Sequence, residues 1–264
     1  MIDIFITTYL RQDFAKECVK FIRERTRTPY KITIIDNGGN KWAEEDPDIR
    51  YVPLWKSVGN SGIHFAWNVA ASLAEGPYFI TTDPDLLVPD LTITSLMSQE
   101  EISKLTATEV AIRANAGEVG DWLDRMIDLI DDRPDYGAIS MMPHIFIGAA
   151  SIDPNDPEDV LERNMCGAVF RIMRTEAVKQ VGGWELKIEA GRNHEERTIC
   201  SKLQAAGFKT GICSRIRAYH NFGTNWGYPE EFTPEMQKHN PDLKDYVKQF
   251  DQRSAYDEKT WLPK

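Results

Sequence analysis

The sequence lacks the long apolar run that a membrane span requires: no stretch approaches the roughly 20 apolar residues of a transmembrane helix. A signal-peptide pattern is also missing, because Asp3 and Arg11 interrupt the apolar residues near the N-terminus. The four cysteines are scattered, and no two of them form the C-x-x-C pair typical of a zinc site. They stand among apolar neighbours, as free buried thiols do. We therefore expect a cytoplasmic protein in a reducing compartment.

Positive charge is in short supply. The 264 residues include 31 Lys and Arg against 41 Asp and Glu, which gives a net charge of −10. Such a chain has no general attraction for nucleic acid or for an anionic membrane surface. A polyanionic ligand therefore needs a local binding device, such as a metal ion, a helix N-terminus or a few basic side chains.

Internal repeats and low-complexity linkers are absent as well, so one continuous domain is expected. In the first third of the chain, apolar patterns of strand period and of helix period alternate. The expected strands lie at 2–6, 31–35, 51–52 and 77–82, and the expected helices at 13–25 and around Phe65, Val69 and Leu73. Strands that alternate with helices indicate an α/β fold, in which crossover helices flank a mostly parallel sheet.

The second half of the chain is more elaborate. Two capping-box patterns predict short helices over 98–116. Further elements are expected as a helix from Trp122 to Ile130, a strand at 137–142, an apolar stretch at 166–173 followed by a helix at 175–181, a helix from Glu195 that ends at Gly207, and a strand at 211–219. The remaining C-terminal segment is polar, aromatic and rich in turn residues.

Polar residues follow three of the predicted strands. Thr7-Thr8-Tyr9, Asp36-Asn37 and Asp83-Pro84-Asp85 stand beyond carboxyl ends of strands, where open α/β sheets bind their ligands. Asp36 can accept a hydrogen bond from a base or a ribose hydroxyl, and Tyr9 can line the same pocket. The three strand ends together predict one ligand site.

The acidic turn at Asp83 and Asp85 suggests a metal. In an extended chain these two side chains point the same way, and carboxylates about 6 Å apart repel by about 3 kcal/mol at an effective dielectric of about 20. A divalent cation removes that repulsion, and Mg²⁺ or Mn²⁺ prefers oxygen ligands and often bridges to substrate phosphates. The prediction is a metal that carries a diphosphate, and the alternative is a polar turn with surface acids.

An ordered set of motifs resembles the GT-A glycosyltransferases, and most closely the inverting family 2 group. The spacing from Asn60-Ser61-Gly62 through Asn68 and Gly76 to the D-x-D at Asp83 is that of the family without a gap. Asp36-Asn37-Gly38 is similar to its second-strand D-N-G turn. The likeness covers roughly residues 2–92 and 121–223.

The C-terminal half is similar to the same family. Its further motifs are Gly167 to Arg174, the G-G-(aromatic) at Gly182-Gly183-Trp184, Glu195 to Leu203 in place of E-D-x-D-L-C-x-R-L, Ala206-Gly207-Phe208, and His220 to Gly223 in place of H-x-x-G. The resemblance implies a single GT-A domain over 1–264. Its parts are a nucleotide-sugar half at 1–92, an insertion at 93–120, an acceptor and catalytic half at 121–223, and an extension at 224–264.

The resemblance implies an inverting, metal-dependent transfer of a sugar from a nucleotide-sugar donor, with UDP-sugars favoured, to a hydroxyl of a glycan-type acceptor. It places Glu196 as the general base with Glu195 beside it, Mn²⁺ or Mg²⁺ on Asp83, Asp85 and His220, and the acceptor near Gly167, Trp184 and Trp226. The expected donor-binding residues are Thr7, Thr8, Tyr9, Asp36, Asn37, Asn60, Gly62, Asn68 and Asp83.

Three departures from the family pattern keep other functions open. Trp67 replaces a basic residue before the Asn, Thr198 replaces the second acid, and Lys202 replaces the usual Arg. They motivate a carbohydrate-binding or scaffold protein on a decayed transferase domain. A sugar-phosphate nucleotidyltransferase shares the sheet architecture, but that class opens with a Gly-rich loop, and residues 7–11 contain no Gly.

Overall fold

The computed structural model describes residues 1–9, 12–37, 41–54, 62–88, 121–143, 160–185 and 194–220. The helices expected over 98–116 lie outside these residues, as does the C-terminal extension. Within the described ranges, no helix has the length and the apolar character that spanning a membrane requires.

The first half builds a parallel sheet, as the alternating pattern predicts. Four parallel strands stand in the order β3-β2-β1-β4. Their bounds are β1 (Ile2–Thr8), β2 (Tyr30–Asp36), β3 (Ile49–Pro53) and β4 (Tyr78–Thr82). All seven residues of β1 are buried, because this strand lies between two others and under helices on both faces.

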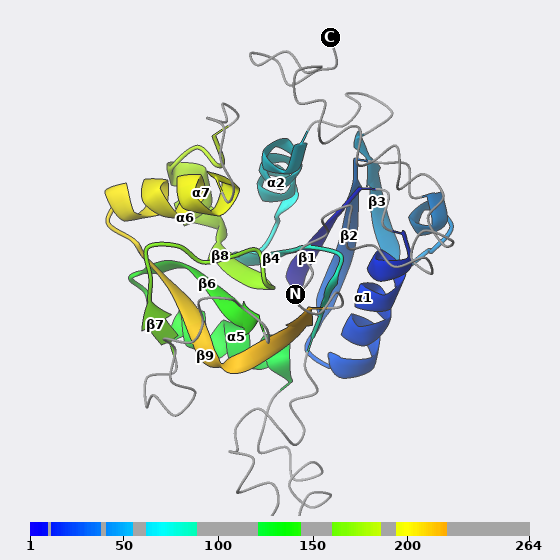
Figure 1. The fold of residues 1–264 in the computed structure, drawn as a ribbon, viewed down its shortest axis with the longest axis horizontal. Coiled ribbons are helices and arrows are strands. Elements are labelled where there is room, and N and C mark those ends of the chain that lie inside the picture. Colours follow the sequence, from blue (N-terminus) through cyan, green and yellow to red (C-terminus); the bar gives the residue numbers. More distant parts are fainter. Residues whose placement is uncertain are drawn as a thin grey trace, which may run out of the picture.

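The second half extends the same sheet in the order β4-β8-β6-β9-β5. β7 lies beside β9 (Figure 1). The strands are β5 (Leu86–Leu87), β6 (Tyr136–Pro143), β7 (Val160–Glu162), β8 (Arg171–Arg174) and β9 (Lys209–His220). β8 runs antiparallel to β4 and to β6, whereas β6 and β9 are parallel. The mostly parallel α/β sheet is confirmed, and the antiparallel β8 at its centre is a feature that the sequence pattern did not predict.

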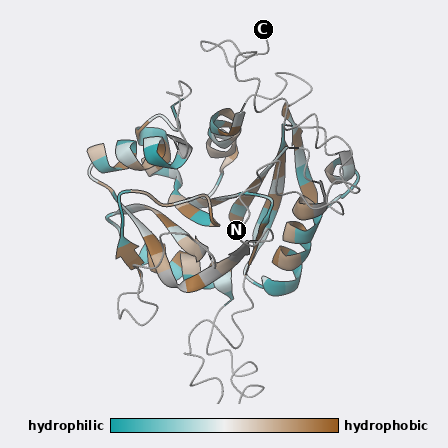
Figure 2. Cartoon of the chain, in the orientation of Figure 1, coloured by the Kyte–Doolittle hydropathy of each residue, from teal (hydrophilic) through white to brown (hydrophobic). Residues whose placement is uncertain are grey.

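Helices cover both faces of the sheet. One apolar cluster joins α1 and α5 to one face, and a second joins α2, α6 and α7 to the other. Their bounds are α1 (Gln12–Arg25), α2 (Gly62–Leu73), α5 (Trp122–Asp131), α6 (Thr175–Gln180) and α7 (His194–Ala205), with a 3₁₀ turn η1 (Lys41–Glu44) before β3. Figure 2 shows hydrophobic and hydrophilic residues alternating around α1, as expected for a helix with one face on a core.

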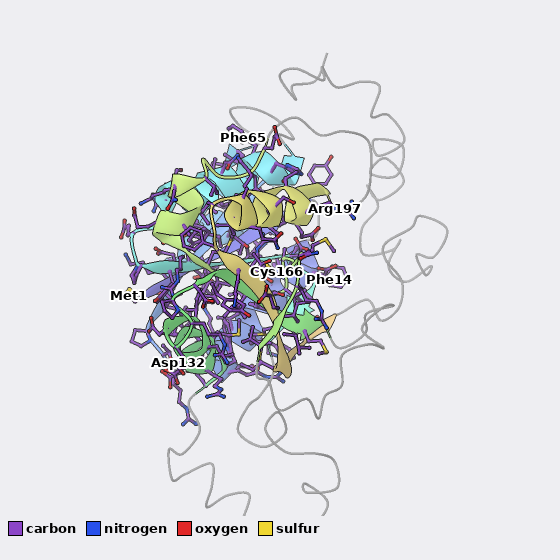
Figure 3. All side chains as sticks on the ribbon, turned by 90° about the vertical axis from the view of Figure 1, so that its left-hand side faces the viewer. Met1, Phe14, Phe65, Asp132, Cys166 and Arg197 are labelled. Carbon is purple, nitrogen blue, oxygen red and sulfur yellow. The ribbon has the colours of Figure 1, made fainter. Side chains whose placement is uncertain are left out.

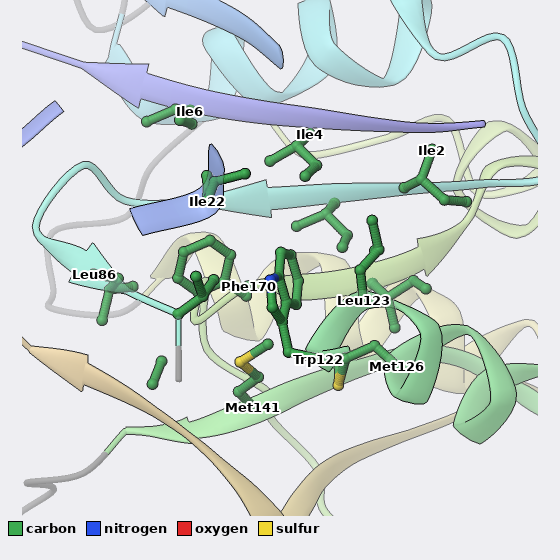
Figure 4. Packing of buried hydrophobic residues seen from close by; sticks show 14 of the residues in the cluster. Ile2, Ile4, Ile6, Ile22, Leu86, Trp122, Leu123, Met126, Met141 and Phe170 are labelled. Carbon is green, nitrogen blue, oxygen red and sulfur yellow. The ribbon is translucent and has the colours of Figure 1, made fainter. Parts of the chain in front are cut away.

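The core under α5 is built on two aromatic rings. Trp122 and Phe170 are fully buried, with their ring centroids 5.2 Å apart in an edge-on arrangement. Figure 4 shows them between the isoleucines of β1 and the α5 side chains Leu123 and Met126. Phe170 has a φ of 41°, which is unfavourable for a residue with a side chain. Its packing on Trp122 holds this backbone turn just before β8.

Asp121 connects α5 to the chain that follows α1. Its Oδ1 atom caps α5 by accepting from Leu123 N at 2.9 Å and Asp124 N at 3.0 Å. Its Oδ2 atom accepts from Thr28 N at 2.6 Å and from Arg27 N. Partial burial opposes ionisation of Asp121, but these backbone donors outweigh it and lower the pKa of the carboxyl group. The charged form of Asp121 therefore stabilises the fold.

We expect Asp121→Ala to lower the free energy of unfolding by about 2–3 kcal/mol, because a cap and several further acceptor contacts are lost. Asp121→Asn keeps a capping oxygen and should cost less.

The stabilisation by Asp121 should also depend on pH. The carboxyl pKa is lower in the folded chain than in the unfolded chain, where it lies near 3.9. Its contribution is therefore complete above that value and is lost as the pH falls through the folded-state pKa. Urea unfolding of both variants across pH 3–7 measures this. A difference between wild type and Asn that stays constant down to the lowest pH would contradict it.

Candidate active site

The carboxyl ends of β1, β2 and β4 meet at one edge of the sheet. In the strand register, Thr8 faces Asp36 on β2, and Ile6 faces Thr82 on β4. Asp83 therefore follows directly beyond this edge. The polar strand ends singled out in the sequence are brought together, because parallel strands place their carboxyl ends on the same side.

Asp36 forms a polar floor at this edge. The side chain is fully buried, and its carboxylate accepts from the Thr8 hydroxyl at 3.3 Å and from the Tyr51 hydroxyl at 2.7 Å. Next to it, Asn37 Nδ2 donates to the Gly62 carbonyl at 3.5 Å. The contacts with Thr8 and Tyr51 hold the Asp36 carboxylate in one orientation.

Tyr51 is the residue of this floor that sequence reasoning missed. It stands on a strand that was predicted only as Tyr51-Val52, and it pairs with Ile34 two residues before Asp36. The sequence did contain a signal for this contact, since a tyrosine stands on the predicted strand that follows the D-N-G turn. The same edge includes Gly62, which begins α2 with a φ of 77° that favours glycine.

The acidic turn at Asp83 to Asp85 connects β4 to β5. β5 pairs antiparallel with the end of β9, and the register sets Leu86 opposite His220. The backbone position of His220 is thereby brought beside the acidic turn, as the resemblance implied. On the other side, Arg25 Nη1 donates to the Val88 carbonyl at 2.6 Å, which ties the end of this segment to α1.

The two carboxylates of the turn act on the same buried sulfur. Burial raises the pKa of the Cys18 thiol on α1, and the negative charges of Asp85 and Asp83 raise it further. Both carboxylates therefore lie within electrostatic range of one atom. Their proximity fits a hard divalent cation, which needs only one or two carboxylates when phosphates and water complete its shell. Among the residues that the structure describes, no group of three His, Cys, Asp or Glu side chains forms a complete metal site.

Glu196 lies in the first turn of α7 and is half-buried. Its charge is among the causes that raise the pKa of the Cys166 thiol, so its carboxylate is close to the residue that precedes Gly167. The expected base therefore lies within electrostatic range of the start of the expected acceptor segment. Glu195 belongs to the same turn of the helix.

Three side chains hold the backbone of the G-G-(aromatic) motif. Asn68 accepts from Trp184 N at 2.8 Å and donates to Trp184 O at 2.9 Å. Lys202 donates to the Gly183 carbonyl at 2.6 Å, and His64 Nδ1 lies 2.6 Å from the Glu185 carbonyl oxygen. Both polar atoms of Asn68 are engaged with Trp184, so the donor-binding role expected of Asn68 stays a prediction. We name the turn 182–185 with these three side chains the clasp.

The Trp184 ring belongs to the core. It is 2% exposed and packs on Trp67, with the ring centroids 5.5 Å apart. The guanidinium of the fully buried Arg171 lies over both rings, 4.8 Å from the Trp67 centroid and 5.4 Å from that of Trp184. An acceptor contact of Trp184 remains a prediction, and in this structure the ring stacks with Trp67 and Arg171. Sequence reasoning did not single out Arg171.

The clasp predicts a difference between two adjacent glycines. Gly182 and Gly183 have φ values of 71° and 67°, so alanine is strained equally at both, by about 1–2 kcal/mol. A Cβ at Gly183 would also overlap with Asn68 Oδ1, whereas one at Gly182 meets nothing within 4 Å. We expect Gly183→Ala to destabilise the chain by about 1–3 kcal/mol more than Gly182→Ala.

Urea unfolding in two backgrounds tests this explanation. In the Asn68→Ala background the excess cost of Gly183→Ala should disappear, because the overlapping oxygen is gone. An excess of the same size in both backgrounds would show that Asn68 is not its cause.

Of the other residues expected in the site, the structure describes Thr7, Tyr9 and Gly167. Thr7 is buried at the end of β1, and Tyr9 follows β1 and is half-buried. A Cβ at Gly167 would meet only Val169, at 3.6 Å, which leaves the backbone there uncrowded. Asn60 and Trp226 lie outside the described residues, as does the whole 93–120 insertion.

One family model matches the first part of the chain. The model of glycosyl transferase family 2 matches residues 3–108, which include β1 to β5 and the acidic turn. A search of the curated proteins gave no match.

Solved structures share the fold at low sequence identity. A TarS fragment from S. aureus, residues 1–349, is 13% identical, with a TM-score of 0.56 over 84% of this chain and 60% of that one. The mannosyltransferase PcManGT from Pyrobaculum calidifontis, in complex with GDP-Man and Mn²⁺, is 15% identical, with a TM-score of 0.55 over 93% of this chain and 68% of that one. GalNAc-T7, with UDP, GalNAc and Mn²⁺, is 11% identical, with a TM-score of 0.58 over 83% of this chain and 43% of that one.

This chain therefore spans 60% of the TarS fragment and 43% of GalNAc-T7. At these identities the likeness to solved structures shows the fold alone. The chain therefore has a GT-A fold, and its residues 3–108 match the model of glycosyl transferase family 2.

Proposed function

We propose that the chain is an inverting, divalent-metal-dependent glycosyltransferase that moves a sugar from a nucleotide-sugar donor, with UDP-sugars favoured, to a hydroxyl of a glycan-type acceptor. The proposal includes the single-domain organisation over 1–264 and a cytoplasmic location. The four cysteines support that location, because all four are buried and none of them forms a disulfide.

One observation carries the proposal: the acidic turn, the Asp36 floor and the end of β9 meet at the carboxyl edge of the sheet. The register places Thr8 beside Asp36, and Leu86 opposite His220. The acidic turn is suited to bind a metal ion. Next to it, the buried Asp36 carboxylate is a hydrogen-bond acceptor suited to a nucleoside. A nucleoside diphosphate carries both of the chemical groups that this arrangement fits.

The proposal gives a role to each of these residues. Asp83, Asp85 and His220 would hold Mn²⁺ or Mg²⁺, which when bound would offset the charge of the departing nucleoside diphosphate. Asp36, kept in one orientation by Thr8 and Tyr51, accepts a hydrogen bond from the base or ribose of the donor. Glu196 takes the proton of the acceptor hydroxyl, whose oxygen attacks the anomeric carbon from the side opposite the leaving group. Attack from that side inverts the anomeric configuration.

Related structures support this choice of ligands. TarS has been solved with UDP-GlcNAc, and GalNAc-T7 with UDP, GalNAc and Mn²⁺. PcManGT, in contrast, holds GDP-Man with Mn²⁺. UDP-sugars are therefore the first donors to test, with GDP-Man as the comparison.

A scaffold protein on a decayed transferase domain is the alternative, motivated by the departures at Trp67, Thr198 and Lys202. Two of these residues have defined contacts in the fold. Trp67 stacks with Trp184 under a guanidinium, and Lys202 donates to the Gly183 carbonyl. These contacts show that two of the departures fit the fold and need not reflect loss of a site. A nucleotidyltransferase has no specific observation in its favour.

A panel of nucleotide sugars with and without Mn²⁺ tests the proposal. A ligand that binds only the folded chain raises its melting temperature by mass action. We expect one UDP-sugar to raise it in the presence of Mn²⁺ and to release UDP when an acceptor is added. Proton NMR of the product should show the inverted anomeric configuration. A retained configuration, or binding of nucleotide sugars without any release of nucleotide across the panel, would overturn the proposal.

A further inference from the structure

Two cysteines from distant parts of the chain meet beneath α7. Cys166 stands at the start of the expected acceptor segment, and Cys200 lies on α7, one helical turn after Glu196. Their Sγ atoms are 3.6 Å apart, and both residues are fully buried. Figure 3 shows Cys166 below the helix that carries Arg197. The two thiols are neighbours without a bond between them.

The surroundings of the pair favour a thiolate on Cys200. Cys166 N donates to Cys200 Sγ at 3.4 Å. The contact with the Cys166 thiol lowers the pKa of Cys200, against the effect of burial, and the positive charge of Arg171 lowers it further. The same contact and burial raise the pKa of Cys166. Ionisation of the pair is therefore favoured at Cys200 over Cys166. A Cys200 thiolate is an attacking group, and the Cys166 thiol 3.6 Å away is a partner that can condense with the product.

Arg171 fixes this charge arrangement. Its side chain is fully buried, and its Nη1 atom donates to the Cys166 carbonyl at 3.2 Å while Nη2 donates to the Thr81 hydroxyl at 3.3 Å. The guanidinium thus links the strand that leads to the acidic turn with the residue that carries one sulfur. A buried cation beside a cysteine pair is an environment in which a thiolate is stable.

We propose that Cys166 and Cys200 form a peroxide-reactive dithiol site, which converts to an intramolecular disulfide. In the first step the Cys200 thiolate attacks one oxygen of hydrogen peroxide, and the O–O bond breaks to give Cys200 sulfenic acid and hydroxide. In the second step the Cys166 sulfur attacks the sulfenic sulfur, and the S–O bond breaks to give the disulfide and water. The two sulfurs lose two electrons in total, and the peroxide gains them.

Formation of the bond requires movement at the site. The sulfurs must approach by about 1.5 Å to reach a disulfide length of about 2.05 Å. α7 carries both Cys200 and Glu196, so closing this gap shifts the expected base relative to the acceptor segment. Any effect on transfer rests on the proposed function, whereas the disulfide itself does not.

Burial sets the choice of reagent for the test. Both thiols are reached only through local opening, which favours a small oxidant over a bulky aromatic disulfide. The full chain is treated with hydrogen peroxide, and intact mass, free-thiol count and peptide mapping under non-reducing conditions are followed over time. We expect a mass loss of about 2 Da, a peptide pair joined through Cys166 and Cys200, and full reversal by dithiothreitol.

The other two buried cysteines are internal controls. Cys18 should react at least about tenfold more slowly than the pair, because burial and the charges of Asp85 and Asp83 raise its pKa. Cys213 is the second buried cysteine against which the rate of the pair is compared. Cys213→Ser should form the disulfide at the wild-type rate. In Cys166→Ser the Cys200 sulfenic acid should accumulate and be trapped by dimedone, and in Cys200→Ser no disulfide should form.

Each result bears on the site alone, whether or not the chain proves to be a transferase. Oxidation of all four cysteines at similar rates would overturn the proposal, as would oxidation of Cys200 to the sulfinic acid in the wild type without a crosslink. If the crosslink forms and the chain has no transfer activity, the dithiol site stands and the proposed function fails.

Discussion

Glu196→Gln is expected to lower the rate of sugar transfer by about 10²–10⁴-fold, the usual contribution of a general base. Glutamine keeps the size and shape of the side chain but cannot accept the acceptor's proton. Glu196 lies near Cys166 at the start of the acceptor segment, so the loss should fall on kcat. The proposed donor site is formed by Asp36 and the acidic turn, which this change leaves intact. The affinity for the donor should therefore stay within about twofold of the wild type. Nucleotide release under saturating donor measures the effect.

Two further variants make this test specific. Glu176→Gln is the matched control, because Glu176 also stands in the first turn of a helix but its side chain is 87% exposed, whereas Glu196 is half-buried. Its activity should equal that of the wild type. Glu195→Gln distinguishes the two neighbouring acids: a full loss there, with Glu196→Gln active, would transfer the role of base to Glu195 and contradict our assignment.

Asp85→Asn is expected to reduce transfer by about 10²–10³-fold and to raise the Mn²⁺ concentration needed for half-maximal activity. The change removes one negative charge from the turn while the side chain keeps its shape. A hard cation loses a carboxylate ligand, and the departing diphosphate loses part of its charge compensation. Activity measured across a Mn²⁺ titration separates the two effects, because high metal concentration restores only the weaker binding.

The control for this variant is Asp48→Asn, on a side chain that is 84% exposed before β3. It makes the same change in net charge away from the edge of the sheet and should leave the Mn²⁺ titration unchanged. If Asp85→Asn and Asp48→Asn behave alike, the acidic turn does not bind the metal.

The alternation of strand and helix patterns was sufficient to predict the parallel half of the fold. The patterns of β1, α1, β2 and β4 are local, because each repeats every two residues or every three to four along one segment. β5 and β7 were missed, since two or three residues are too few to show a period. The antiparallel insertion of β8 between β4 and β6 was missed for another reason. Pairing between distant strands leaves no local trace in the sequence.

In the candidate site, too, residues with a local sequence signal were predicted and residues placed by long-range packing were missed. Asp36 and Asp83 were predicted because polar residues at strand ends are conspicuous and the motif spacing is specific. Arg171 was not predicted, because an arginine in a four-residue strand is expected to face solvent. Its guanidinium is buried against Trp67 of α2 and Trp184 of the 182–185 turn, which are distant from it in the sequence. The meeting of Cys166 with Cys200 likewise depends on how α7 packs. Contacts of this kind arise from tertiary packing and are visible only in the folded chain.

The most direct test of the central claim is nucleotide-dependent binding of Mn²⁺ at the acidic turn. Isothermal titration of Mn²⁺ into the wild type, with and without saturating UDP, and into Asp85→Asn under the same conditions gives the affinity of each combination. The account predicts one site in the wild type that UDP tightens at least about tenfold, and loss of that tightening in Asp85→Asn. Equal Mn²⁺ affinity with and without UDP in the wild type, or UDP-dependent tightening that persists in Asp85→Asn, would contradict it.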